Sequence, residues 1–403
     1  MKNKTLEVYY HNKHVGTLAQ TPEKMIAFQY DNEWIKEGFP INPLTLRLDN
    51  TVFIPEAKSI DIFHGLHGVF ADSLPDSWGE LLLDRYLESI GIASEDLSIL
   101  DRLSYVGKSG IGALEYRPSK QSDYDFSINN LDYDTIAKSC NDLLSSKQID
   151  ELNLLYNLGG SSGGTRPKIY LHEDNRDWIL KFPAKNDPAI SGIREYDYSL
   201  CAKRCGINMT ETKLVPSKFC EGYFMTERFD KKGNDKVFSI TFAGLLDIDF
   251  RAPSCDYETF MKVVQVLTKD NIEDKKQMYK IMCFNVLTHN RDDHTKNFSM
   301  LFTKDNGFRL APAYDLTYST TYYGEHTTSV NGKGKDITDK DLITVGTKAG
   351  LSKKFCTEDL ELIKSETTSL AKYLKKTSSV KKHISWSDRL KEIAGSEENS
   401  QGQ

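Results

Sequence analysis

The sequence predicts an α+β protein of two lobes, with a β-rich first half and a mainly helical second half. At 403 residues the chain is long enough for two or three domains. β-forming residues with partial alternation fill 6–12, 15–18 and 25–30, which predicts an opening β-meander. From about Asp256 onward apolar residues recur at helical spacing, over 257–267, 275–288, 357–373 and 380–394. A cleft between two such lobes is a common place for a ligand site.

Composition disfavours several classes of protein. The chain is 39% hydrophobic and 27% charged, which is typical of a folded globular protein. A net charge of -6 disfavours direct binding to DNA. The seven cysteines form no Cys-x-x-Cys pair, so we expect neither a disulfide framework nor a zinc site, and a reducing cytoplasmic location. No apolar run approaches the ~18 residues of a transmembrane helix, and the N-terminus lacks the apolar stretch of a signal peptide, so no membrane association is expected.

Residues 1–117 are expected to form an N-terminal subdomain built from the meander and one helix. Pro75-Asp76-Ser77-Trp78 begins that helix, and Gly91 ends it. Glycines between Leu103 and Tyr116 predict a loop that leads into a strand. The polar stretch that follows predicts a connection and then a helix, together spanning 118–150.

The stretch from Leu158 to Leu171 is rich in glycine. It contains Gly-Gly-Ser-Ser-Gly-Gly-Thr-Arg-Pro before a strand that starts near Lys168. Glycines let backbone N–H groups approach phosphate oxygens without obstruction by side chains. The spacing differs from that of a Walker A loop. A phosphate loop of another kind is one interpretation, and a flexible linker is the other.

A second β run, Trp178 to Pro183, carries Lys181 in its middle. A buried lysine needs an acidic partner, and Glu195, on a helix predicted over 192–206, is the candidate. Protein kinases pair a strand Lys with a helix Glu to hold the phosphates of ATP. The alternative is that Lys181 extends to solvent from an edge strand. The buried face of the helix is predicted to consist of Ile193, Tyr196 and Leu200.

Tyr223 to Asp230 predicts a strand with a charged exit. In a two-lobed kinase this is where backbone groups would meet the adenine, although by itself it is only a strand and a turn. The N-terminal lobe is therefore expected to be completed by 151–235. A helical C-terminal lobe is expected over 236–395, followed by a disordered tail over 396–403.

The densest polar cluster, 290–297, reads Asn-Arg-Asp-Asp-His-Thr-Lys-Asn between a predicted helix and a predicted strand. Asn306-Gly307 predicts a hairpin that returns Asp315 beside Asp292 and Asn297. Two carboxylates and an amide suit Mg²⁺. Kinases arrange a base Asp, an Asn five positions later and a second Asp after a hairpin in this way. Each residue alone is better explained by a polar turn, and only the whole arrangement favours a site.

Together these motifs resemble the HipA family of toxin–antitoxin serine/threonine kinases, over about residues 5–375. The resemblance is carried by Phe-His-Gly-Leu at 63–66, Leu-Pro-Asp at 74–76, Val-Gly at 106–107, Gly-Ala-Leu at 112–114, the glycine-rich motif at 159–168, Lys181, Glu-Arg-Phe-Asp at 227–230, the polar cluster at 290–297 and Ala-Pro-Ala-Tyr-Asp at 311–315. It implies a bilobal protein-kinase-like fold with an extra N-terminal subdomain. It also implies ATP and Mg²⁺ as cofactors and a HipB-like DNA-binding antitoxin as partner, with DNA reached only through that antitoxin.

The resemblance also implies roles for single residues. Asp292 corresponds to the catalytic base, and Asn297 and Asp315 correspond to the Mg²⁺ ligands. Lys181, with Glu195 as its partner, corresponds to the phosphate-binding lysine, and His294 joins the catalytic set. The implied ATP-binding residues are Gly163, Gly164, Thr165, Arg166, Pro167, Lys168, Lys181, Glu227, Arg228, Phe229, His294, Asn297, Tyr314 and Asp315.

Family members can phosphorylate a serine of their own phosphate loop, and Ser161 stands at the matching position, with Ser162 as its close rival. Thr165-Arg166 departs from the commoner Val-Gln at these positions. The implied target is a translation component such as an aminoacyl-tRNA synthetase. Two alternatives remain open at this point: a small-molecule phosphotransferase similar to aminoglycoside phosphotransferases, and a catalytically silent chain that binds ATP and serves as a co-repressor with its antitoxin.

Overall fold

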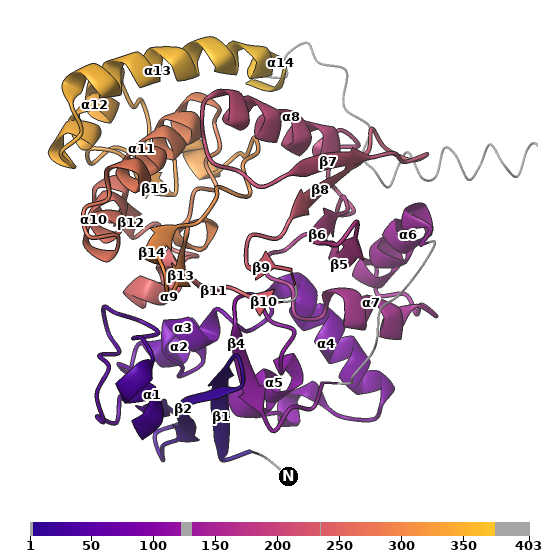
Figure 1. Ribbon diagram of the computed structural model, residues 1–403. Helices are drawn as coiled ribbons and strands as arrows, with labels where there is room; N and C mark the ends of the chain where they lie inside the picture. Colours follow the sequence, from indigo (N-terminus) through magenta and orange to yellow (C-terminus); the bar gives the residue numbers. More distant parts are fainter. Residues whose placement is uncertain (1–2, 122–130, 234, 375–403) are drawn as a thin grey trace, which may run out of the picture.

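The computed structural model describes residues 3–121, 131–233 and 235–374 (Figure 1). The helix expected over 380–394 and the tail over 396–403 lie outside these residues, as do residues 122–130 of the expected connection. Within the described ranges, ten of the fifteen strands end by Lys236, and four helices of 10 to 16 residues dominate the part beyond it, in keeping with the predicted α+β class.

The N-terminal meander forms a four-stranded antiparallel sheet in the order β3-β2-β1-β4. Its strands are β1 (Thr5–Tyr10), β2 (Lys13–Gln20), β3 (Ile26–Tyr30) and β4 (Leu114–Arg117). Alternate residues such as Leu6 and Val8 are fully buried, because one face of the sheet rests on a core. The helices of this segment are α1 (Asn32–Glu37), α2 (Ser59–Phe63), α3 (Gly68–Ala71), α4 (Ser77–Ser89) and α5 (Ile99–Val106).

A second antiparallel sheet has the order β5-β6-β8-β7. Its strands are β5 (Lys168–Glu173), β6 (Arg176–Lys181), β7 (Thr212–Val215) and β8 (Tyr223–Glu227). In the register of β5 with β6, Lys168 lies directly opposite Lys181. The helices around this sheet are α6 (Tyr133–Leu144), α7 (Leu152–Gly159) and α8 (Ser191–Arg204) (Figure 1).

The second half of the chain is mainly helical. Its helices are α9 (Phe242–Leu246), α10 (Tyr257–Leu267), α11 (Ile272–Leu287), α12 (Asp339–Lys348), α13 (Lys353–Thr367) and α14 (Ala371–Leu374). A three-stranded antiparallel sheet consists of β11 (Phe238–Thr241), β13 (Ser299–Thr303) and β14 (Gly307–Leu310). Two short strand pairs are β9 (Lys231–Lys232) with β10 (Asp235–Lys236), and β12 (Cys255–Asp256) with β15 (Thr328–Ser329).

Two hydrophobic cores hold the described chain together. The first joins the N-terminal sheet to the helical half, and in it Phe39 stacks on Phe302 with ring centroids 3.8 Å apart. The second contains Trp78 of α4 together with Trp178 of β6. The indole Nε1 of Trp78 donates to the carbonyl of Lys168 at 3.1 Å. The N-terminal segment therefore packs against both halves, and α4 reaches the start of β5.

The predicted buried face of α8 was wrong. Ile193, Tyr196 and Leu200 are only partly buried, and the buried face carries Tyr198, Cys201 and Ala202. The reason is that Glu195 points toward Lys181, and positions three, four and seven residues further on share its face of the helix. The core therefore forms about 160° away from the predicted stripe, almost on the opposite face of the helix.

The predicted loop from Leu103 begins inside a helix. Residues up to Val106 belong to α5, which starts with a capping box between Ser98 and Asp101. Only the glycine-containing part after Val106 is irregular before β4. Helix α7 was not predicted. It ends at the glycine-rich stretch and so determines where that stretch begins.

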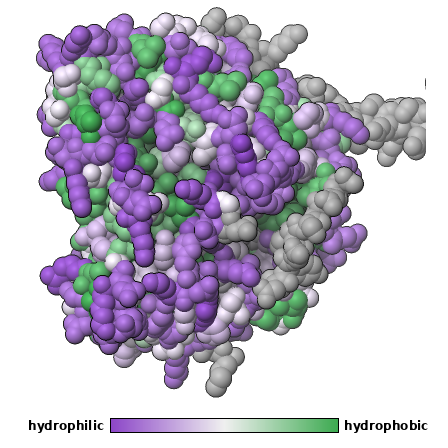
Figure 2. Space-filling model, in the orientation of Figure 1, coloured by the Kyte–Doolittle hydropathy of each residue, from purple (hydrophilic) through white to green (hydrophobic). Residues whose placement is uncertain are grey.

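The molecular face in the orientation of Figure 1 is covered mainly by polar residues, with apolar residues scattered between them (Figure 2). Among the described helices, none combines the length and apolar character needed to cross a bilayer.

Candidate active site

The cluster 290–297 forms a loop between α11 and β13. Its start is tied to α11, because Asn290 donates from its N–H to the carbonyl of Asn285 at 2.9 Å and from Nδ2 to Asn285 Oδ1 at 3.0 Å. Asn285 Nδ2 in turn donates to the hydroxyl of Tyr257 on α10 at 2.9 Å. All three side chains are buried, so the loop leaves its helix in a fixed direction.

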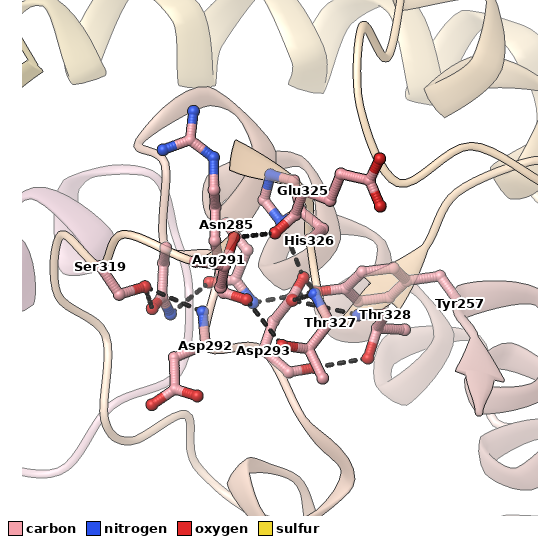
Figure 3. A network of polar contacts seen from close by, with 12 residues as sticks. Tyr257, Asn285, Arg291, Asp292, Asp293, Ser319, Glu325, His326, Thr327 and Thr328 are labelled. Carbon is pink, nitrogen blue, oxygen red and sulfur yellow. Dashed lines mark hydrogen bonds and ion pairs between the residues drawn. The ribbon is translucent and has the colours of Figure 1, made fainter. Parts of the chain in front are cut away.

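Asp293 is the internal anchor of this loop (Figure 3). Its carboxylate is fully buried and accepts from the hydroxyl of Tyr257 and Nδ1 of His326, both at 2.9 Å. It also accepts from the N–H groups of Thr327 and Thr328 at 2.9 and 3.2 Å. A buried carboxylate needs such donors, so Asp293 fastens the loop to 326–328 and does not face a substrate.

Asp292, the preceding residue, points away from this network (Figure 3). Its side chain is 61% exposed, and its Oδ1 lies 3.8 Å from Nε2 of His294. Its backbone N–H donates to Ser319 Oγ at 2.8 Å. The backbone is therefore held while the carboxylate stays open, as a general base for an incoming hydroxyl requires.

Asn297 and Lys296 complete the loop. Asn297 Nδ2 donates to the carbonyl of Asp292 at 2.7 Å, so its Oδ1 is the atom left to bind a cation. Lys296 Nζ lies 2.5 Å from Oδ1 of Asp76, a residue of the N-terminal segment next to α4. The loop 290–297 thus contacts a part of the chain that is remote in sequence.

The β13–β14 hairpin returns Asp315 to this loop, where Asn290 Nδ2 donates to the carbonyl of Asp315 at 3.4 Å. Asp315 has a φ of +54°, in the left-handed region, which Asp tolerates better than most residues. Its carboxylate forms a close ion pair with Lys181. Lys181 also pairs with Glu195 at 2.6 Å, so the lysine joins β6, α8 and the segment after β14.

Burial and opposite charges compete in this cluster. Burial raises the pKa of Asp315, but Lys181 and Lys168 together hold that pKa well below its ordinary value. Burial lowers the pKa of Lys181, but Asp315 and Glu195 raise it above its ordinary value. Lys168 forms no ion pair within the described ranges, and burial together with Lys181 lowers its pKa to about 8. The site therefore has a firmly charged carboxylate and one lysine that titrates near neutral pH.

The glycine-rich stretch lies between α7 and β5. Gly164 has a φ of +84°, which favours glycine, and its N–H donates to Asp76 Oδ2 at 2.9 Å. Lys168 Nζ donates to the carbonyl of Gly163, so the lysine lies beneath the loop. The carbonyl of Pro167 accepts from the main chain just after β6 at 2.8 Å. The loop therefore lies beside the lysines of both strands.

The remaining loop residues have distinct environments. Thr165 and Arg166 are exposed, and Arg166 forms a two-pronged ion pair with Asp187, with Nε–Oδ2 at 2.7 Å. Ser161 is 8% exposed and donates to the carbonyl of Ser109 at 2.9 Å. Ser162 is fully buried, and its hydroxyl has no partner among the described residues. Neither serine can reach an active site unless the loop moves outward.

Glu227, Arg228 and Phe229 end β8 at the predicted adenine-binding exit. The N–H groups of Glu227 and Arg228 already donate to neighbouring main-chain carbonyls at 2.9 and 2.8 Å. The guanidinium of Arg228 forms a buried two-pronged pair with Asp230 at 2.9 and 2.7 Å. The ring of Phe229 lies 5.2 Å from that of Tyr314. The end of β8 can therefore present main-chain carbonyl groups and an aromatic ring to an adenine. The side chain of Arg228 is not available for this, because it is bound to Asp230.

The donor set fits a nucleotide with a divalent cation. Asn297 Oδ1 and Asp315 offer oxygen ligands of the kind that Mg²⁺ prefers, and Mg²⁺ commonly takes its other ligands from water and substrate phosphates. Lys181, Lys168 and glycine N–H groups offer positive charge to those phosphates. In the described part of the chain, no group of three or more His, Cys, Asp or Glu side chains could hold a metal ion.

Family models match both halves of the chain. A model of the HipA N-terminal domain matches residues 6–117, and a model of the HipA-like C-terminal domain matches residues 160–377. The second alone covers more than half of the sequence. This chain belongs to the HipA family. The catalytic loop, the hairpin and nearly all of the glycine-rich stretch lie inside the C-terminal match.

Curated relatives include kinases and a kinase toxin. The serine/threonine-protein kinase toxin HipA of Shewanella oneidensis is 22% identical over 353 residues, which cover 80% of this chain and 76% of the relative. The putative kinase Y4dM of Sinorhizobium fredii is 25% identical over 197 residues, which cover 44% of this chain and 47% of the relative. The chain thus spans about half the length of the second relative.

A solved structure supports the fold. A chain of the Shewanella oneidensis HipA, HipB and operator DNA complex aligns with a TM-score of 0.68 at 18% identity, covering 97% of this chain and 94% of that chain. This likeness confirms the predicted bilobal, kinase-like α+β fold.

Two positioning residues of this HipA site received no role from sequence reasoning. Asp76 appeared only in the predicted helix start at 75–78 and within the Leu-Pro-Asp motif. That motif was the available signal, because it carried part of the family resemblance. Asp293 appeared only as one member of a polar cluster. Nothing local distinguishes it from Asp292, since both are aspartates of the same loop.

Proposed function

We propose that this HipA protein is an ATP-dependent serine/threonine protein kinase and the toxin of a type II toxin–antitoxin module. The observation that carries the proposal is the bridge from Lys181 to both Glu195 and Asp315. It sets a phosphate-binding lysine beside a carboxylate suited to a divalent cation, which is the arrangement of protein kinases. Asp292 stands exposed on the adjoining loop, where an acceptor hydroxyl can approach.

In the proposed reaction, Asp292 orients a serine or threonine hydroxyl of the substrate and accepts its proton as the oxygen attacks the γ-phosphorus of ATP. The bond between the γ-phosphorus and the β,γ-bridging oxygen breaks, and ADP leaves. Lys181 and Lys168 bind phosphate oxygens and lower the negative charge that the attacking oxygen meets. Asn297 keeps Asp292 in place through its hydrogen bond to the Asp292 carbonyl.

Asn297 and Asp315 would hold Mg²⁺, which when bound supplies further positive charge to the phosphates. Glu195 retains Lys181 on the opposite side from Asp315. His294 contributes positive charge near Asp315 whenever it is protonated. The adenine would lie at the exit of β8, beside Phe229 and the backbone carbonyls.

Self-modification at Ser161, with Ser162 as the alternative, is part of the same proposal. Both serines are buried, so the phosphate loop must first leave its place. A phosphate carries about −1.5 to −2 charges and cannot return to a position where Ser161 Oγ lies 2.9 Å from the Ser109 carbonyl. Modification would therefore keep the loop outside and switch the enzyme off.

The proposed partner is a HipB-like DNA-binding antitoxin, supported by the likeness to a chain of the Shewanella complex. DNA would then be contacted through the antitoxin, in keeping with the net charge of -6. The proposed protein substrate is a translation component such as an aminoacyl-tRNA synthetase. A cytoplasmic location accords with the seven free cysteines. A gel shift of operator DNA with the antitoxin, with and without this chain, tests the partnership.

The enzymatic proposal is tested by intact mass and phosphopeptide mapping after incubation with ATP and Mg²⁺. We expect a phosphopeptide that carries phosphate on Ser161 or Ser162 in the wild type and none in Asp292→Asn. Asp305→Asn is the matched control, because it removes an exposed carboxylate from the hairpin turn.

Two other outcomes would replace the proposal. If the chain binds ATP but modifies neither itself nor any of a panel of synthetases, the silent co-repressor takes its place. If it phosphorylates a sugar or an aminoglycoside and no protein, it is a small-molecule phosphotransferase.

A further inference from the structure

The segment after Asp315 carries a run of hydroxyl groups. Residues 317–323 read Thr-Tyr-Ser-Thr-Thr-Tyr-Tyr, so seven consecutive side chains bear one. This run lies along the catalytic loop, because the N–H of Ser319 donates to the carbonyl of His289 at 3.2 Å and Ser319 Oγ accepts from the N–H of Asp292 at 2.8 Å. A change in the conformation of the run would therefore directly alter the contact that holds Asp292, the proposed catalytic base.

Two arginines near the run form no ion pair with any of the described residues. The guanidinium carbon of Arg194, on α8, lies 5.7 Å from the ring centre of Tyr318. Arg291 directly precedes Asp292, whose N–H bonds Ser319. Within the described ranges neither arginine forms a salt bridge, and the Nε atom of each is buried without a hydrogen-bond partner. Figure 3 shows the guanidinium of Arg291 extending away from the Asp293 network, with no contact drawn to it.

Basic side chains lie near both arginines, and within the described ranges the carboxylates of Asp187 and Glu195 act on Arg194 only from beyond ion-pair distance. Burial lowers the pKa of His289, and Arg291 and His326 lower it further, which places three basic side chains near one another. Burial, reinforced by another arginine, also lowers the pKa of Arg194. Asp293 cannot serve as counter-ion, because its carboxylate already binds four donors. Partly buried guanidinium groups without a counter-ion are unfavourable, and an added anion would relieve that cost.

We propose that phosphorylation of the hydroxyl run at Thr320 supplies this anion, and that Arg194 and Arg291 hold the phosphate. Thr320 is exposed, whereas Ser319 and Thr321 are partly buried and their hydroxyls are already bonded. A phosphothreonine adds about −1.5 to −2 charges and three strong acceptor oxygens. An arginine fork can donate two hydrogen bonds to such a group.

The consequence is an activating modification. Arginine–phosphate pairs of this kind order activation loops in protein kinases. Here the phosphate would pin the run between α8, which carries Glu195, and the catalytic loop, which carries Asp292. It would thereby fix the two sides of the site relative to each other. Its effect is opposite in sign to that of a phosphate on Ser161, which would hold the phosphate loop outside.

For its phosphate donor this inference rests on the proposed kinase function. The γ-phosphoryl group of ATP moves to Thr320 Oγ, the hydroxyl proton passes to Asp292 of a second copy of the chain, and ADP leaves. The phosphate-binding role of Arg194 and Arg291 does not depend on which kinase performs that transfer, so it can be tested separately.

The test places phosphothreonine at position 320 during synthesis, in a full chain that also carries Asp292→Asn, so that the chain cannot itself add phosphate. Amide hydrogen exchange over 317–325 is compared with that of the unphosphorylated chain. We expect exchange to slow by about tenfold, as one or two charge-assisted hydrogen bonds would produce. The slowing should vanish in Arg194→Gln and in Arg291→Gln. It should persist in the control Arg47→Gln, whose side chain is 78% exposed in the N-terminal segment.

An unchanged exchange rate on phosphorylation, or equal slowing in both arginine variants, overturns the inference. It is also overturned if the arginine variants change only the binding of an acidic protein substrate, because the two side chains would then serve substrate recognition. If exchange slows as expected but the wild-type chain acquires no phosphate from ATP, the modification site stands. In that case another kinase must be the donor, and the proposed kinase function is decided separately by the test on Ser161, Ser162 and the synthetase panel.

Discussion

The catalytic loop and the phosphate loop meet at the proposed active site, but they are held in different ways. The catalytic loop is built around Asp293, a buried carboxylate whose four donors come from the helical half. The phosphate loop is clamped from outside by Asp76, which accepts from the N–H of Gly164 and pairs with Lys296. Many buried contacts fix a segment, whereas a few exchangeable ones let it open locally. Aspartate thus serves as a permanent anchor in one loop and as a releasable clamp in the other.

The largest expected effect is on the rate of phosphoryl transfer, and it distinguishes Asp292 from Asp293. Asp292→Asn should lower the rate of phosphoryl transfer by about 10²–10⁴-fold, the usual contribution of a general base. Because this side chain is exposed, the free energy of unfolding should stay within about 0.5 kcal/mol of the wild type. Steady-state kinetics and urea unfolding measure the two quantities. A large loss of stability would show that Asp292, too, anchors the loop.

Asp293→Ala, unlike Asp292→Asn, should strongly lower the stability of the protein. Removal of this carboxylate leaves His326, Tyr257 and two N–H groups without their acceptor, which should lower the free energy of unfolding by about 3–5 kcal/mol. Urea unfolding followed by far-UV circular dichroism measures the change. Asp293→Asn is the milder control, since an amide oxygen can still accept from part of the donor set. A loss below about 1 kcal/mol, as for an ordinary surface substitution, would contradict the view of Asp293 as an anchor.

Asp76→Asn tests whether Asp76 holds the phosphate loop in place. The amide can still accept from Gly164, but it no longer carries the charge that pairs with Lys296. We expect the KM for ATP to rise by about tenfold, equivalent to ~1.4 kcal/mol, with a smaller change in kcat. Hydrogen exchange in the phosphate loop should become faster. Asp84→Asn, on the adjoining helix α4, is the control, because its partner Arg102 lies outside the site. A loss of kcat at constant KM would argue against a clamp on the loop.

The smallest effect concerns pH. Burial and the nearby Lys181 lower the pKa of Lys168 to about 8, so this lysine is charged below pH 8 and neutral above it. Since only the charged form attracts phosphate, kcat/KM for ATP should fall as pH rises through about 8, by up to tenfold between pH 7 and 9. Lys168→Arg should remove this fall of kcat/KM at high pH, because arginine keeps its charge. If kcat/KM of that variant still fell through pH 8 as in the wild type, another group would be responsible for the pH dependence.

Local patterns predicted much of the molecule. The opening meander, the strand that carries Lys181 and the Asn306-Gly307 hairpin follow from β-forming residues and turn chemistry that act over a few positions. The buried face of α8 was missed, because it depends on where Glu195 must point. For the site, motif spacing and family resemblance indicated Asp292, Asn297 and Asp315, whose roles remain predictions.

The sequence by itself determined the order of the elements, the residue types available for phosphate and cation binding, and the family. These depend on periodicity, turn residues and motif spacing, which are properties of neighbouring positions. Only the tertiary structure decided that Asp76 meets Lys296, 220 positions away. It also decided that Asp293 is buried while Asp292 is exposed. Burial is set by contacts between distant segments, and two adjacent aspartates carry the same local signal until such contacts form.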